Sequence, residues 1–102
     1  MSLRKDQSEF VRMVALLILF ADRMGFELTF GDAMAKDGHK DNSFHYKRLA
    51  IDLNLFQNGV YLTESVHHTQ LGHFWEKIGG TWGGTFDPPD GNHYSYLEGI
   101  NT

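Results

Sequence analysis

The stretch LAIDLNLF, residues 49–56, decides the fold because a large apolar residue stands at every second position. From Leu49 to Leu55 these residues are Leu or Ile, so their side chains would share one face of a strand. Asp52 would lie in the middle of the opposite face. The pattern therefore predicts a strand with one face in the core, although a carboxylate on the other face is equally typical of a solvated strand.

The segments around this strand predict further antiparallel strands. QNG at 57–59 is a hairpin signal, after which VYLT at 60–63 can return beside the first strand. FELTF at 26–30 alternates in the same way, and HYSY at 93–96 is a short aromatic strand. Together they make a small antiparallel sheet.

Two segments have apolar residues at helical spacing, residues 7–24, which Gly25 follows, and residues 67–80, which end in Gly79 and Gly80. Ser8 or Asp6 could cap the first helix. The polar composition of residues 31–42 predicts a loop with possible short helical turns. Helices and antiparallel strands in this order predict an α+β fold, with the helices packed on one face of the sheet.

Length and composition predict one domain over residues 1–102. The chain is 41% hydrophobic and 22% charged, which is ordinary for a globular protein. Its formal net charge is -4 and its nine Lys and Arg residues are scattered, so binding to nucleic acid is not expected. It has no cysteine, which leaves His, Asp and Glu as metal ligands.

The longest apolar run is VALLILFA at 14–21, shorter than the roughly 20 residues of a membrane span. We interpret it as a buried helix face. Asp6 and Glu9 interrupt the basic start that a signal peptide would need. We therefore expect no membrane insertion, synthesis without a signal peptide, a cytoplasmic location and a monomer.

The chemistry is carried by His45, Asp52 and the β-turn sequence DGNH at 90–93. Seven residues span roughly 10 Å in a helix and roughly 23 Å in a strand, so the chain must bend if His45 and Asp52 bind one metal. If His93 joined them, two histidines and one carboxylate would leave a fourth position open, as in catalytic zinc sites. Asp90 would then be placed to act as the general base.

Three segments carry a resemblance to a known family: SFHYKRLAID at 43–52, WGG at 82–84, and Asp90-x-x-His93. The first resembles the S-x-H-x-x-G-x-A-x-D signature of the zinc D-alanyl-D-alanine carboxypeptidases and phage L-alanyl-D-glutamate peptidases, and the others resemble its second half. The similarity runs from about Phe10 to Tyr94 and extends to small phage endolysins of Gram-negative hosts.

This resemblance implies a Hedgehog and D,D-peptidase-like fold and Zn²⁺ held by His45, Asp52 and His93, with Asp90 as the catalytic base. It also implies the peptidoglycan stem peptide as the substrate. Two positions depart from the family pattern. Arg48 stands where glycine is usual, and GDAMAK at 31–36 lacks the arginine that commonly grips a substrate carboxylate.

Further residues are candidates for substrate contact. Lys36 and Lys40 could replace the missing arginine, and His39 lies in the loop that would border the cleft. Ser43 belongs to the family pattern but could simply cap a turn. Trp82 is open between two roles, a core residue or an aromatic beside glycines that let a peptide approach.

Other polar residues have simpler explanations. Asp87 is a rival to Asp90 as the base, but turn or capping work is the better prediction because Pro88 and Pro89 stiffen the chain between the two. Three more histidines fit a helix surface or cap rather than a second metal site. They are His67, His68 and His73.

Taken together, the sequence predicts a zinc peptidase of the phage-endolysin type that cuts the L-alanyl-D-glutamate bond and reaches the cell wall after release from the host cytoplasm. The alternatives are a D-alanyl-D-alanine carboxypeptidase and a non-catalytic wall-binding module in which zinc only stabilises the fold.

Overall fold

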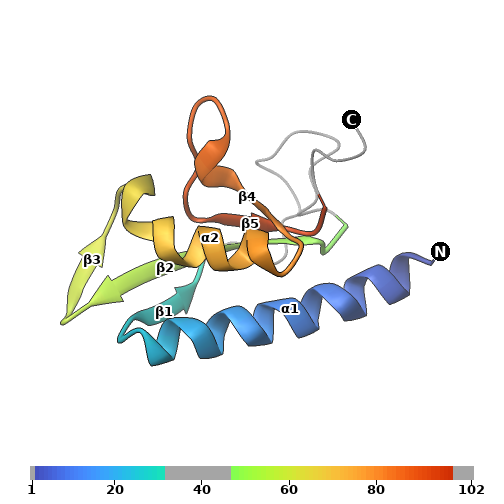
Figure 1. Ribbon diagram of the computed structural model, residues 1–102, viewed down its shortest axis with the longest axis horizontal. Helices are drawn as coiled ribbons and strands as arrows, with labels where there is room; N and C mark the ends of the chain where they lie inside the picture. Colours follow the sequence, from blue (N-terminus) through green and yellow to red (C-terminus); the bar gives the residue numbers. More distant parts are fainter. Residues whose placement is uncertain (1, 32–46, 98–102) are drawn as a thin grey trace.

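Strand β2 (Ala50–Gln57) is the centre of a five-stranded antiparallel sheet in the computed structural model, which describes residues 2–31 and 47–97 (Figure 1). Strand β1 (Glu27–Phe30) pairs along one edge of β2. Strands β3 (Val60–Leu62) and β5 (His93–Ser95) pair with its two ends along the other edge. Strand β4 (Thr81–Trp82) pairs with the outer side of β5.

The turn between β2 and β3 is the predicted two-residue hairpin. Asn58 and Gly59 have φ angles of 53° and 78°, which the residues of a type I′ turn require. The turn sets the register in which Gln57 faces Val60.

Helix α1 (Leu3–Arg23) begins four residues before the predicted start, so the proposed caps Ser8 and Asp6 were wrong. Ser2 is the cap, because its side-chain oxygen accepts a hydrogen bond of 3.1 Å from the backbone N–H of Lys5. The helix ends as predicted at Gly25, whose φ of 86° suits glycine.

The second predicted helix consists of two pieces. A 3₁₀ helix, η1 (Ser65–His68), leads directly into α2 (Thr69–Lys77). Another 3₁₀ turn, η2 (Gly83–Thr85), follows β4, and neither η2 nor β4 was predicted. Within residues 2–31 and 47–97, no helix is both long and apolar enough to cross a membrane.

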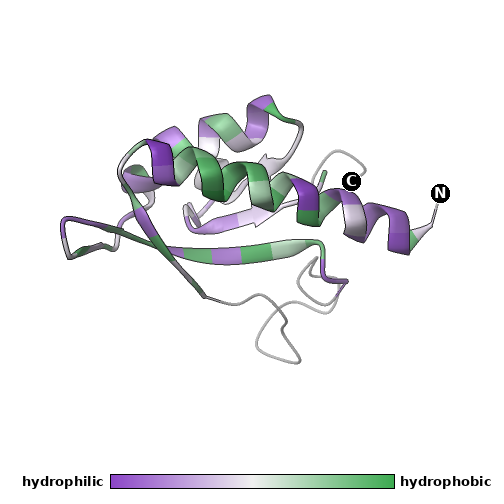
Figure 2. Cartoon of the chain, turned by 90° about the horizontal axis from the view of Figure 1, so that it is seen from below, coloured by the Kyte–Doolittle hydropathy of each residue, from purple (hydrophilic) through white to green (hydrophobic). Residues whose placement is uncertain are grey.

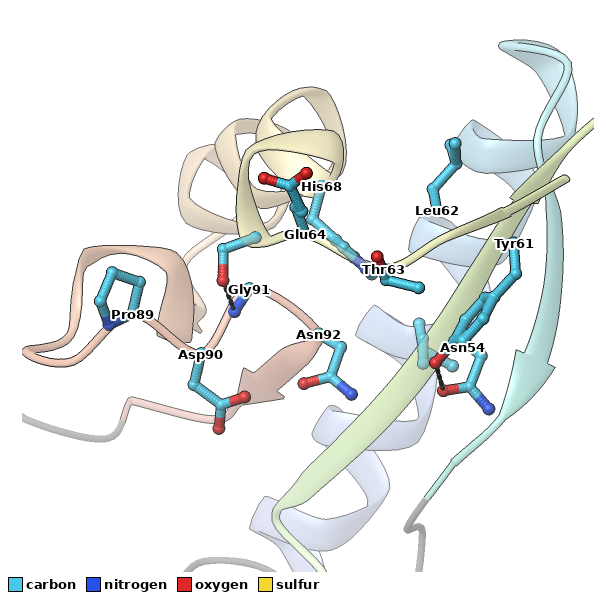
Figure 3. Close-up of a pocket in the computed structure, with 12 residues that line it drawn as sticks. Asn54, Tyr61, Leu62, Thr63, Glu64, His68, Pro89, Asp90, Gly91 and Asn92 are labelled. Carbon is cyan, nitrogen blue, oxygen red and sulfur yellow. Dashed lines mark hydrogen bonds between the residues drawn. The ribbon is translucent and has the colours of Figure 1, made fainter.

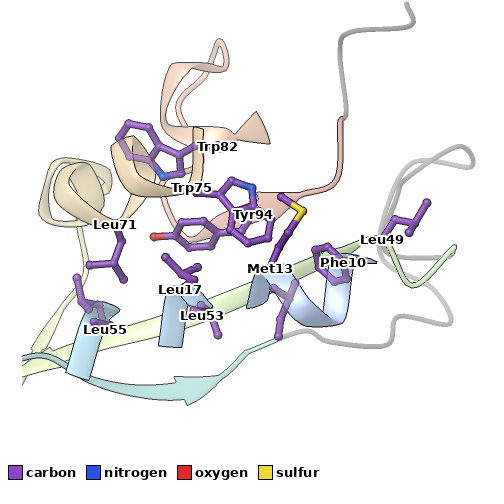
Figure 4. Close-up of a cluster of buried hydrophobic side chains, with 12 residues drawn as sticks. Phe10, Met13, Leu17, Leu49, Leu53, Leu55, Leu71, Trp75, Trp82 and Tyr94 are labelled. Carbon is purple, nitrogen blue, oxygen red and sulfur yellow. The ribbon is translucent and has the colours of Figure 1, made fainter. Parts of the chain in front are cut away.

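Both helices cover the same face of the sheet, which confirms the predicted α+β arrangement (Figure 2). The core lies between them and the inner face of β2, where Leu53 and Leu55 are fully buried. Trp75 of α2 packs edge-on against Tyr94 of β5 (Figure 4). Because the helices occupy this face, Asp52 lies on the opposite face of β2.

Candidate active site

Asp52 and His93 form a cross-strand pair. They are direct partners in the β2–β5 ladder, and Asp52 Oδ1 lies 3.6 Å from His93 Nδ1. The ladder hydrogen bond from Leu53 N to Asn92 O, 2.9 Å, belongs to the neighbouring pair. By alternation, Asp52 and His93 occupy a non-hydrogen-bonded pair, in which side chains approach most closely.

Asp90 is the first residue of the predicted β-turn, and the structure confirms this turn. The N–H of His93 donates to the carbonyl oxygen of Asp90 at 3.1 Å, and the N–H of Asp90 donates to that of Gly83 at 2.8 Å. Ser65 Oγ accepts from Gly91 N at 2.8 Å, and Trp82 Nε1 donates to Gly91 O at 2.7 Å. Contacts from η1, β4 and η2 therefore hold the turn beside β2.

Gly83 explains one part of the Trp-Gly-Gly motif. A Cβ atom built on Gly83 would lie 2.2 Å from the carbonyl oxygen of Asp90 and 2.8 Å from His93 Cβ. Real side chains do not approach this closely, so only glycine lets η2 pack directly against the turn.

The side chains of Asp52, Asp90 and His93 converge. One ligand-type atom from each of them lies within 4.8 Å of the other two. The Asp52 and His93 side chains are 19% and 7% exposed, whereas Asp90 is exposed. Two carboxylates this close repel each other, and a cation between them would relieve that repulsion.

The donor set fits a zinc ion. Zinc takes imidazole nitrogen and carboxylate oxygen at about 2.0–2.2 Å, so two ligands of a tetrahedral ion lie about 3.4 Å apart. The 3.6 Å between Asp52 and His93 is close to this spacing, and it is too long for a good hydrogen bond.

Several predicted site residues lie outside the described residues. They are Lys36, His39, Lys40, Ser43 and His45. Asp87 lies within the described residues and is exposed. It does not belong to the convergent group of Asp52, Asp90 and His93.

Trp82 adopts the core alternative of its two predicted roles. It is 5% exposed, belongs to the hydrophobic core and supports the turn through the bond to Gly91. A Cβ on Gly72 or Gly84 would collide with its indole ring, at 2.0 and 2.2 Å. Nearly all of the ring is therefore enclosed by the protein.

A pocket of about 240 Å³ opens beside Asp90 (Figure 3). Its walls come from β2, β3 and the segment after it, η1, and residues 89–92. Most of its side chains are polar and uncharged, among them Asn54, Thr63 and Asn92. It is a recess in which part of a substrate reaching Asp90 could lie.

His68 lines this pocket. It was predicted at a helix surface or cap; the surface position was wrong, whereas His68 is the N-cap residue of α2, without a side-chain cap hydrogen bond. It is 4% exposed, and its Nδ1 lies 2.7 Å from the hydroxyl oxygen of Tyr94. His67 does serve as a cap, since its Nδ1 accepts from Glu64 N at 3.2 Å, and His73 is exposed. The sequence did carry a signal for this burial, because His68 stands three and seven residues before the buried Leu71 and Trp75.

Comparison with known proteins adds the family. A family model described as D-alanyl-D-alanine carboxypeptidase matches residues 36–96, more than half of the chain. The chain belongs to this family. The matched range contains both predicted half-motifs, from His45 to His93. No individual curated protein matches the chain.

Membership in the D-alanyl-D-alanine carboxypeptidase family indicates a peptidase that acts on peptidoglycan. The backbone at position 48 explains why glycine is usual there in the family. Arg48, where glycine is usual, has a φ of 59°. This left-handed conformation favours glycine, so Arg48 occupies a position whose backbone suits the usual residue better.

Proposed function

We propose that the protein is a zinc-dependent peptidoglycan peptidase of the phage-endolysin type, hydrolysing the L-alanyl-D-glutamate bond of the stem peptide. The observation that carries the proposal is the convergence of Asp52, Asp90 and His93 in a chain of this peptidase family. A wall-binding module would need the metal ligands for stability, but it would have no use for an additional exposed carboxylate beside them.

His45, Asp52 and His93 would hold the zinc. When bound, zinc supplies a Lewis acid that activates water and polarises the scissile carbonyl. The β2–β5 register supports the assignment of Asp52 and His93, because it holds their side chains at the spacing of two zinc ligands.

Asp90 is the proposed general base. Its backbone is fixed at N–H and C=O by Gly83 and His93, so its carboxylate starts from a defined position. An exposed carboxylate can take a proton from the attacking water and return it to the leaving amine. Asp87, which lies outside the convergent group, is not placed for this transfer.

The endopeptidase specificity rests on charge. A carboxypeptidase must bind a free terminal carboxylate beside the scissile bond, and arginine does this best. Among the described residues that line the pocket beside Asp90, there is no Lys or Arg, while Glu64 and Asp90 are acidic. These negative charges disfavour a free terminal carboxylate beside the scissile bond, and so favour a peptide whose chain continues beyond that bond.

We also propose that the protein accumulates in the host cytoplasm as a monomer and meets the wall after a separate protein has opened the membrane. Fractionation of host cells before lysis tests this location, and the protein should be recovered in the cytoplasmic fraction.

Mass spectrometry of fragments released from purified peptidoglycan tests the activity. The expected products are peptides with a new D-glutamate amino terminus and glycan strands that keep L-alanine. Free D-alanine as the dominant product would instead establish the carboxypeptidase. Wall binding without any released fragment would establish the non-catalytic module.

A further inference from the structure

His68 links the core to the pocket beside Asp90. It is the last residue of η1, it is 4% exposed, and its Nδ1 is occupied by Tyr94 at 2.7 Å. The same residue lines the pocket, and its ring extends from η1 toward Thr63 (Figure 3). The imidazole therefore uses Nδ1 for a contact in the core, while its second nitrogen, Nε2, faces the pocket.

The hydrogen bond with Tyr94 determines where the imidazole proton lies. The Tyr94 side chain is fully buried, and within the described residues His68 is the only hydrogen-bond partner of its hydroxyl. A buried hydroxyl proton needs an acceptor, so the phenol donates and Nδ1 accepts. The proton of the neutral ring must then be on Nε2.

The ring stays neutral at physiological pH. Burial, with a smaller contribution from the charge of His67, lowers the pKa of His68 to about 4. In the part of the chain that the structure describes, Nε2 has no hydrogen-bond partner. An uncharged N–H donor is thus available at the wall of the pocket.

The charges around the pocket select what this donor can bind. Glu64 and Asp90 line it, and the described lining residues include no Lys or Arg. A substrate carboxylate would meet two negative charges with only a neutral donor to offset them. A peptide or amide carbonyl oxygen accepts the same hydrogen bond without that repulsion.

We propose that His68 is a specificity-determining residue whose Nε2–H donates to an uncharged carbonyl oxygen of the stem peptide, in a subsite formed by the pocket beside Asp90. The proposal rests on the proposed function and names a contact within it. The role of Tyr94 is to fix the tautomer that makes the donor available.

Nuclear magnetic resonance of ¹⁵N-labelled histidine tests the contact without turnover. The zinc-loaded Asp90→Asn protein is titrated with the free stem tetrapeptide. The expected spectrum shows His68 protonated at Nε2, with this signal shifting as the peptide binds. A His68 proton on Nδ1, or binding that shifts His93 but not His68, would overturn the subsite and leave the peptidase proposal standing.

Two substitutions separate the donor from the structural role. His68→Gln keeps an N–H near Nε2, whereas His68→Asn keeps an amide near Nδ1 for Tyr94 and removes the donor from the pocket. In the protein with Asp90 intact, His68→Asn should raise KM about two- to tenfold, the value of one neutral hydrogen bond, with kcat nearly unchanged.

His68→Gln should stay closer to the parent KM. His73→Asn is the matched control, because His73 is exposed on α2 outside the pocket, and it should change neither constant. Equal losses in both His68 variants, with a lower kcat and a lower melting temperature, would mean a purely structural role. If the unsubstituted protein released no fragments from peptidoglycan, the proposed function itself would be wrong.

Discussion

Asp52 Oδ1 and His93 Nδ1 lie 3.6 Å apart because the two residues face each other across β2 and β5. The site therefore depends on strand register. A slip of β2 by one residue would turn Asp52 into the core and bring Ile51 or Leu53 opposite His93. The hydrophobic alternation that buries Leu53 and Leu55 prevents this slip, so the core also sets the geometry of the candidate metal site.

The metal assignment predicts that the purified protein contains one zinc per chain. His45→Ala, Asp52→Ala and His93→Ala should each lose most of it, because each removes a ligand from a separate segment. Zinc content should also fall as the pH drops below about 6.5, where free histidine becomes protonated. Elemental analysis measures both effects, and full zinc in His45→Ala would contradict the ligand set.

Asp90→Asn should keep zinc and fold but lower kcat by about 10²- to 10⁴-fold, the usual contribution of a general base. Asp87→Asn is the control, since Asp87 is exposed and outside the convergent group. Fragment release from peptidoglycan gives the rates. If Asp90→Asn also lost its zinc, Asp90 would be a ligand rather than the base.

Gly83→Ala should reduce kcat/KM by about 10²-fold, because its methyl group would push the turn that carries Asp90 and His93. Gly79→Ala is a matched control. It is strained by a φ of 106°, but its added Cβ meets nothing within 4 Å. It should lower thermal stability while leaving kcat/KM of the folded protein unchanged.

Arg48→Gly should stabilise the protein by up to about 1 kcal/mol. A non-glycine residue costs roughly 1–2 kcal/mol in the left-handed conformation, and glycine returns part of this through its larger entropy loss on folding. Urea denaturation measures the change. Lys47→Gly, at a residue without a positive φ, should not be stabilising, and equal gains in both variants would rule out backbone strain as the cause.

His68 should make stability depend on pH. Its pKa is lowered to about 4 in the folded state and is about 6.5 when unfolded, so between these values the unfolded chain binds the extra proton. Folding free energy should therefore weaken as pH falls from 6.5 toward 4 and stay level below it. The loss is about 2–3 kcal/mol by pH 4.5. Urea titrations of metal-free protein should show this component, and His68→Gln should lack it.

The sequence was sufficient for the elements whose residues repeat on one face. Alternation from Leu49 to Leu55 predicted β2, and Asn58-Gly59 predicted its hairpin. The convergence of Asp52 with His93 was predicted from a family motif rather than from spacing. No local pattern contains the register that places residues 41 positions apart on facing strands.

The features that the sequence analysis did not predict have local physical causes. Ser2 was overlooked because Ser8 and Asp6 offered equally good caps nearer the apolar run. His68 stands three and seven residues before the buried Leu71 and Trp75, so helical spacing over 67–80 already places it on the inner face. The prediction of a surface or cap position followed the usual polarity of histidine instead of this spacing. Strand β4 is two residues long, too short for any alternation to appear.

The turn that carries Asp90 accepts hydrogen bonds from Leu53 and Trp82 and donates them to Ser65 and Gly83, and these four residues belong to four different elements. The backbone that carries the Asp90 carboxylate is therefore preorganised: the entropy of ordering this turn is lost during folding rather than when a peptide arrives. If Asp90 is the proposed base, folding rather than substrate encounter sets the position from which it would withdraw a proton.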